Sequence, residues 1–180
     1  MQEKRFAGDI ERLRSPERVE RLDVDRVVGL SLEGDLIKSV LDVGTGTGLF
    51  AEAFSRRAIA VSGIDTNPEM VIASRSYIPD GNFQEGLAEA LPYPDRSFDL
   101  VFLGLLLHES DEPLKTLTEA HRVAGKRVCI LEWPYREQPF GPPLAHRLDP
   151  EVLIGLYHKA GFRKWKVVEL THTTFYRLEI

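Results

Sequence analysis

The stretch VLDVGTGTGLF, residues 40–50, is the most informative part of the chain. It begins as a short apolar strand that ends at an acidic residue, continues through three alternating glycines, and resumes as the amphipathic pattern of residues 49–56. Glycines at such a turn let a ligand approach the backbone, because no Cβ stands in the way and a positive φ costs little. We therefore predict a strand, a ligand-binding turn and a helix, in that order.

The spacing of the glycines indicates which ligand the turn can hold. A dinucleotide fingerprint reads G-x-G-x-x-G, and here Leu49 stands in place of the third glycine. A phosphate-binding loop ends in Gly-Lys-Ser/Thr, which is absent as well. The pattern therefore disfavours a pyrophosphate ligand, and an NAD(P)-dependent oxidoreductase becomes the less favoured enzymatic alternative.

Asp65 is the second informative residue. It ends the apolar run of residues 61–64 and lies 21 positions after Gly44, where the tip of the neighbouring strand is expected. A carboxylate at that tip can accept both ribose hydroxyls of a nucleoside. The alternative is a capping role for the helix that follows Thr66-Asn67-Pro68-Glu69. We favour ribose binding.

Composition restricts the range of partners. The 180 residues are 43% hydrophobic and 28% charged with a net charge of −5, so no basic excess favours nucleic acid or an anionic membrane. Cys129 is the only cysteine, which excludes an internal disulfide and a thiolate metal cluster and favours a reducing, cytoplasmic compartment. The longest apolar run, residues 100–107, is too short to span a bilayer, and the charged N-terminus does not resemble a signal peptide. We expect a cytoplasmic monomer or homodimer, without nucleic-acid binding, membrane insertion or a metal.

Strands and helices alternate along the middle of the chain, which indicates βαβ units and a parallel sheet. The expected strands are Ser39–Val43, Ala60–Ile64, Asn82–Gln84, Phe98–Leu103 and Arg127–Leu131, and the expected helices are Leu49–Arg56, Pro68–Tyr77 and Pro113–Val123. Two further strands, 164–170 and 174–180, are separated by too few residues for a parallel crossover and should form an antiparallel hairpin. We predict an α/β fold, a Rossmann-like three-layer sandwich with a mostly parallel seven-stranded sheet and this C-terminal hairpin.

We expect one domain with four parts. Residues 1–35 form a helical N-terminal cover, 36–132 a cofactor-binding core, 133–150 a proline- and aromatic-rich loop, and 151–180 a helix and the hairpin. The loop should lie on the substrate side. Its Arg136, His146 and Arg147 could meet a polar or anionic substrate, but we favour a solvated face for them.

Several motifs of the core together resemble one known family. They are residues 40–48, Gly63-Ile64-Asp65, Ala88-Glu89-Ala90-Leu91-Pro92-Tyr93 with Ser97-Phe98-Asp99-Leu100-Val101, Leu107-His108-Glu109, and Glu119-Ala120-His121-Arg122-Val123. The chain resembles the class I S-adenosylmethionine-dependent methyltransferases, within them the ubiquinone/menaquinone C-methylase-like group (methyltransferase type 11). The resemblance extends over residues 37–132 and specifies fold and cofactor but no substrate. The family's Pro-Gly-Gly turn before the fifth strand is replaced here by a turn at residues 123–127.

The resemblance implies S-adenosyl-L-methionine as cofactor and assigns roles to matching positions. The positions expected near the methionine part of the cofactor are Asp42, Gly44, Thr45, Gly46 and Gly48, and Asp65 is expected to bind the ribose. The positions expected beside the adenine are Thr66, Met70, Leu87 and Ala88, and Gly104 completes the cofactor-binding set.

Leu87 departs from the family pattern. The family usually places an Asp here to accept from the adenine amino group. We expect adenine to be held by the backbone of Leu87 and Ala88, with Glu85 or Glu89 as a substitute acceptor, and we hypothesise weaker adenine discrimination.

The resemblance implies methyl transfer to a small molecule, and three residues are candidates for the catalytic chemistry. His108 follows the fourth strand, and its ordinary pKa near 6.5 suits proton removal, although a packing role explains it as well. Glu132 is expected at the tip of the fifth strand, as a catalytic group or an ion-pair partner, with Tyr135 close behind it. A non-catalytic S-adenosylmethionine-binding or regulatory protein is the alternative outside the enzymes.

Overall fold

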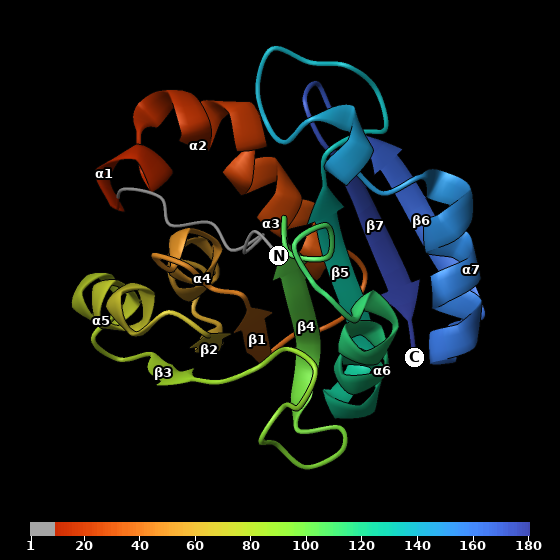
Figure 1. Ribbon diagram of the computed structural model, residues 1–180. Helices are drawn as coiled ribbons and strands as arrows, with labels where there is room; N and C mark the ends of the chain where they lie inside the picture. The colour runs from red at the N-terminus through yellow and green to blue at the C-terminus, as the bar shows by residue number, and fades with distance from the viewer. Residues whose placement is uncertain (1–9) are drawn as a thin grey trace.

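The computed structural model describes residues 10–180, which form a seven-stranded sheet between two layers of helices (Figure 1). The strand order is β3-β2-β1-β4-β5-β7-β6. The strands are β1 (Ser39–Val43), β2 (Ala60–Asp65), β3 (Asn82–Glu85), β4 (Phe98–Gly104), β5 (Ala124–Glu132), β6 (Lys164–Glu169) and β7 (Thr174–Glu179). The predicted α/β fold is confirmed.

The sheet is parallel except for β7. Strands β1 to β5 pair in parallel, whereas β7 runs antiparallel to both of its neighbours, β5 and β6. The backbone N–H of Leu170 donates to the carbonyl of Thr173 at 2.9 Å and closes the short turn between β6 and β7. A connection this short can only reverse the chain direction, so the predicted hairpin is confirmed.

The helices begin and end at the residues that the sequence favours. Ser15, Asn67 and Asp149 each cap a helix whose first residue is proline, and Gly161 ends the last long helix at a φ of 107°. The helices are α1 (Ile10–Leu13), α2 (Pro16–Leu22), α3 (Val24–Leu32), α4 (Leu49–Ser55), α5 (Pro68–Tyr77), α6 (Pro113–Val123) and α7 (Pro150–Ala160), with a 3-10 turn at Leu144–His146. The helical cover is thus present from residue 10 onward, and residues 1–9 of that prediction lie outside the described residues.

Alternating residues of the strands fill two cores, one on each face of the sheet. On one face, Val40 and Phe102 pack against α3, α4 and α5; on the other, Leu41 and Leu103 pack against α6 and α7. This alternation follows from the opposite directions of successive side chains in a strand. The parallel pairing of β1 with β2 and β4 brings the carboxyl ends of these strands together at one edge of the sheet.

Two expectations from the sequence are wrong in detail. Strand β5 starts at Ala124, directly after α6, so residues 124–127 belong to the strand and the expected turn is replaced by an irregularity in the register between β4 and β5. Arg147 is buried instead of solvated.

Arg147 is buried because it organises its own loop. Its guanidinium donates to the carbonyls of Pro134, Arg136, Phe140 and Pro142 and to the side-chain oxygen of Gln138, at 2.7–3.0 Å. Prolines remove backbone donors from this segment, and the arginine supplies donors in their place.

No helix within residues 10–180 is long and apolar enough to cross a membrane.

Candidate functional site

The glycine turn connects β1 to α4 at the carboxyl edge of the sheet. Gly44, Gly46 and Gly48 have φ values of 69°, 53° and 77°, all in the left-handed region that favours glycine. The backbone N–H groups of Gly44 and Thr45 both donate to the carbonyl of Ile64, at 2.8 and 3.0 Å. These bonds fix the turn against the end of β2.

Positions 46 and 104 differ in what a side chain larger than glycine would meet. A Cβ added to Gly46 would meet no protein atom within 4 Å, so the side-chain direction there opens into free space beside the turn. A Cβ added to Gly104 would lie 2.8 Å from the Phe102 ring and 3.2 Å from the Phe50 ring. Gly46 therefore leaves room for a ligand, whereas at position 104 packing already requires a glycine, and its predicted contact with the cofactor stays a prediction.

Asp65 joins the turn to the end of β2. One of its carboxylate oxygens accepts from the Gly46 N–H at 2.8 Å and the other from the Asn67 N–H at 2.9 Å. Asn67, not Asp65, is the N-cap of α5. Each oxygen of Asp65 keeps acceptor capacity beyond its backbone bond, as the predicted contact with two ribose hydroxyls requires.

Asp42 is buried below the glycine turn. Burial raises the pKa of its carboxyl to about 7, and the charge of Asp65 adds to this rise. Hydrogen bonds from the Thr45 hydroxyl, at 2.9 Å, and from the Ala51 backbone act in the opposite direction. A buried carboxyl with this pKa changes its charge near neutrality and favours a cationic neighbour.

The residues predicted beside the adenine lie around the ends of β2 and β3. Thr66 is exposed, Met70 is buried in the first turn of α5, and Leu87 is 48% exposed in the loop with Ala88. The carboxylate of Glu89 accepts from the Ser110 hydroxyl at 2.8 Å. Glu89 is therefore occupied within the protein, and Glu85, exposed at the end of β3, is the better placed of the two substitute acceptors.

His108 and Glu132 form a buried pair at the ends of β4 and β5. His108 Nδ1 lies 2.8 Å from Glu132 Oε2, and the backbone N–H groups of His108 and Trp133 also donate to this carboxylate, each at 3.3 Å. The two residues are 9% and 2% exposed. The carboxylate therefore fixes Nδ1 as the donor and leaves Nε2 of the neutral imidazole as an acceptor.

The pKa of His108 reflects opposing influences. Burial, the largest single influence, lowers this pKa, but Glu132, through its charge and its hydrogen bond, and Glu109 raise it above the ordinary value. Glu109 Oε1 lies 3.6 Å from Nε2.

Tyr135, the third predicted catalytic residue, is not joined to this pair. It is 47% exposed in the loop after β5, and no contact links it to His108 or Glu132 within residues 10–180. The charge of Glu132 acts instead on two other tyrosines, where it adds to the burial that raises the pKa of Tyr157 and Tyr176.

The interpretation of the sequence missed the residues that connect the glycine turn to the turn after β4 and to the N-terminal helices. Leu106 packs on the glycine turn, where its Cδ1 would lie 2.7 Å from a Cβ at Gly44, and Leu105 has a φ of 58°, which is strained for leucine. Arg14 donates to the Thr47 carbonyl at 2.9 Å and lies 3.6 Å from the centroid of the Tyr77 ring. No local pattern marks these residues, because their partners are distant in the sequence.

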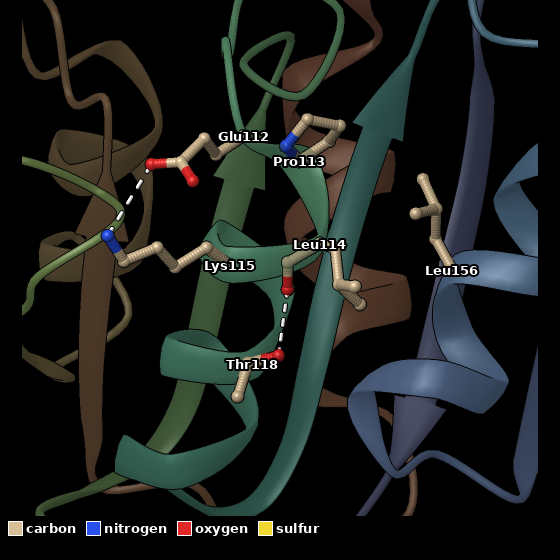
Figure 2. A pocket seen from close by; sticks show the side chains of 6 residues that line it. All are labelled: Glu112, Pro113, Leu114, Lys115, Thr118 and Leu156. Atoms are coloured by element: carbon tan, nitrogen blue, oxygen red, sulfur yellow. Dashed lines mark hydrogen bonds and ion pairs between the residues drawn. The ribbon is translucent and has the colours of Figure 1, made fainter.

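A surface hollow of about 550 Å³ lies apart from these residues, between α6 and α7. Figure 2 shows its lining, in which Lys115 pairs with Glu112 and the Thr118 hydroxyl donates to the Leu114 carbonyl. Its polar side chains thus already bind one another, and none of the predicted site residues lines it. We assign it no role.

Comparisons with known proteins identify the family. The family described as methyltransferase domain matches residues 41–128. A crystal structure of an S-adenosylmethionine-dependent methyltransferase from Aquifex aeolicus is 29% identical, with a TM-score of 0.83 over 95% of this chain and 96% of that one. The chain belongs to the S-adenosylmethionine-dependent methyltransferases.

Curated relatives of this methyltransferase cover part of its length. The demethylmenaquinone methyltransferase of Chlorobaculum tepidum is 39% identical over 99 residues, 54% of this chain and 41% of the relative. The enzyme of the same name from Thermus thermophilus is 35% identical over 147 residues, 77% of this chain and 60% of the relative. The chain therefore spans less than two thirds of the length of these relatives.

The geometry of the methyltransferase site fits the cofactor of its family. The open space at Gly46 leaves room for a ligand, the Asp65 carboxylate keeps acceptor capacity of the kind that ribose hydroxyls need, and the charged form of Asp42 is the one that a cationic ligand would favour. S-adenosylmethionine contains no pyrophosphate, in agreement with the spacing of the glycines.

Proposed function

We propose that the protein transfers the methyl group of S-adenosylmethionine to a small molecule whose nucleophile arrives protonated, with His108 as the base. The observation that carries the proposal is the position of the His108–Glu132 pair. His108 of this pair belongs to the turn after β4 and Glu132 ends β5. Leu106 of the same turn packs on Gly44. The base candidate and the cofactor turn therefore share one edge of the sheet.

The chain's own residues would bind and align the reactants. Asp65 would accept the ribose hydroxyls, Gly46 would leave room for the ligand, and the Asp42 carboxylate would face its cationic end. When bound, S-adenosylmethionine supplies a methyl carbon attached to a positively charged sulfur. Alignment of the nucleophile with that carbon contributes about 7–11 kcal/mol in well-oriented reactions.

His108 and Glu132 would handle the proton. Glu132 accepts from Nδ1, so Nε2 would take the proton of the nucleophile, to which bound S-adenosylmethionine would supply its methyl group. The imidazolium is then stabilised by the adjacent carboxylate until solvent takes up the proton. Glu132 acts as a positioning residue in this scheme.

Ligand binding tests the cofactor assignment. Titration calorimetry should show binding of S-adenosylhomocysteine and none of NAD. Tight NAD binding would favour an oxidoreductase, and the absence of S-adenosylhomocysteine binding would contradict the proposal.

The pH dependence of transfer tests the base. The acceptor for this assay is chosen by screening, with labelled S-adenosylmethionine, both demethylmenaquinone, after which the relatives are named, and small phenolic acids. Transfer should increase as the pH rises through the pKa of His108, and Glu132→Gln should move this increase to lower pH, because it removes the influence that raises the pKa.

A matched control uses the exposed His158 of α7. His158→Asn should transfer methyl groups like the wild type, whereas His108→Asn should lose about a hundredfold or more. NMR titration of the imidazole signals supplies a second readout that needs no acceptor: the His108 signal should titrate at lower pH in Glu132→Gln. An unchanged titration would show that Glu132 does not control His108.

A further inference from the structure

Helix α2 covers the carboxyl edge of the sheet and is held at both ends by arginines (Figure 1). Arg14, just before the helix, donates to the Thr47 carbonyl in the glycine turn at 2.9 Å. Arg21, in the last turn, lies 4.4 Å from the centroid of the Phe140 ring in the loop after β5. The helix thus connects the cofactor turn to the proline-rich loop.

Arg18 lies between these two anchors and differs from them. It is three residues before Arg21, so both side chains share one face of the helix. Arg18 is half-buried, yet its guanidinium has no hydrogen bond or ion pair within residues 10–180.

Arg18 lies on the helix between the residue that contacts the glycine turn and the residue that contacts the loop after β5. Burial, with the positive charges of Arg12 and Arg21, lowers its pKa, and Glu109 is close enough to raise it. Glu109 follows His108 directly in the turn after β4. Arg18 therefore interacts electrostatically with Glu109, in the turn that holds the base candidate His108.

A half-buried cation near two other cations is costly unless anions accompany it, and the charge of Glu109 offsets this cost only in part, because the pKa of Arg18 is still lowered. A guanidinium presents parallel N–H donors that match the two oxygens of a carboxylate. Trp133 and Phe140, whose ring centroids are 5.9 Å apart, add an apolar wall on the Arg21 side.

We propose that Arg18 binds a carboxylate of the methyl acceptor, so that the substrate is a small carboxylic acid whose nucleophile reaches His108. This inference rests on the proposed function. It goes further because it defines which part of the substrate is recognised and by which residue.

The test compares an acid with its neutral analogue. We would measure the binding of para-hydroxybenzoate and para-hydroxybenzamide to the full chain saturated with S-adenosylhomocysteine. The wild type should prefer the acid by about tenfold, Arg18→Gln should abolish the preference, and Arg18→Lys should retain part of it. Arg26→Gln is the matched control, because Arg26 is exposed on α3 and pairs with Asp23; it should keep the preference.

Other outcomes would overturn the inference. Equal binding of acid and amide by the wild type, or binding of neither, contradicts a carboxylate site at Arg18. Loss of S-adenosylhomocysteine binding in Arg18→Gln would assign Arg18 to the cofactor instead. If the wild type itself fails to bind S-adenosylhomocysteine, the proposed function fails, and this result is distinct from a missing acid preference.

A stability measurement separates a ligand-binding role from a structural one. Without ligand, Arg18→Gln should melt at or above the melting temperature of the wild type, because it removes an unpaired charge. Arg14→Gln should melt lower, because it loses the contacts with Thr47 and Glu52. A loss of stability in Arg18→Gln as large as in Arg14→Gln would overturn the inference.

Discussion

The two halves of the proposed site are constructed differently. The cofactor half, defined as the glycine turn (residues 44–48) with Asp42 and Asp65, is held mainly by backbone groups and by these two carboxylates. The substrate half, defined as α2, the turn of residues 105–112 and the loop of residues 133–149, is held by side chains that join distant segments, as in the pairs Arg14–Thr47 and His108–Glu132. The family match, residues 41–128, includes the cofactor half and omits α2 and the loop. The difference teaches that the glycine turn is held by local backbone geometry, whereas the proposed substrate half is held by side-chain contacts between segments distant in the sequence.

Asp42→Asn should have the largest effect, on the pH dependence of the free energy of unfolding. The carboxyl titrates at about 7 in the folded protein and near 3.8 when unfolded, so it favours the folded state at low pH and this contribution is lost as the pH rises to about 7. The wild type should therefore lose about 2–4 kcal/mol relative to Asp42→Asn between these limits. Urea unfolding across this pH range measures the difference.

Asp99→Asn is the control of opposite sign. Contacts with Lys38 and Lys126 outweigh the opposing effect of burial and lower the pKa of Asp99. Its stabilisation is present at neutral pH and is lost as the pH falls through the lowered pKa. Parallel pH profiles for the two variants would contradict the view that Asp42 is a buried, strained acid.

Asp65→Ala should reduce the affinity for S-adenosylhomocysteine by about a hundredfold, because the carboxylate holds the turn and supplies the ribose acceptors. Glu69→Ala removes an exposed carboxylate four residues later and should have little effect. Calorimetry measures both affinities. Similar losses in the two variants would show that only net charge matters.

Gly46→Ala and Gly104→Ala should separate binding from folding. The added methyl group at Gly46 points into open space but blocks the ligand, so affinity should fall by about tenfold while stability falls by about 1–2 kcal/mol from backbone strain. At Gly104 it meets Phe102 and Phe50, so the melting temperature should fall and the folded fraction should still bind S-adenosylhomocysteine. The reverse pattern would place the ligand beside Gly104.

Leu87→Asp should have the smallest effect. A carboxylate at this exposed position would restore an acceptor for the adenine amino group and tighten S-adenosylhomocysteine binding by about three- to tenfold. Ile72→Asp places the same charge on an exposed apolar position of α5 and should leave the affinity unchanged. A change below about twofold in Leu87→Asp would contradict weakened adenine recognition.

The sequence predicted the fold and the conformation of the glycine turn, because both depend on local signals. The capped starts of α2, α5 and α7 and the glycine turn each follow from neighbouring residues. Even the separation of Gly44 from Asp65 is set by one βαβ unit.

The substrate half could not be predicted in the same way. The sequence suggested His108 and Glu132 separately, and only the fold brings these residues, 24 positions apart, to 2.8 Å. Arg14, Leu106 and Arg18 carry no local signature, and Arg147 was expected on the surface because arginines usually are. These roles arise from the tertiary arrangement of the chain.

The five acceptors gathered by Arg147 have a consequence for the specificity of the enzyme. Because one side chain determines the path of the loop, its outward-facing residues, such as Tyr135, can be exchanged without rebuilding the backbone. If the loop contacts the acceptor as proposed, its exposed side chains can vary while Arg147 keeps the backbone path constant. Redesign of acceptor preference should begin at its exposed positions and leave Arg147 in place.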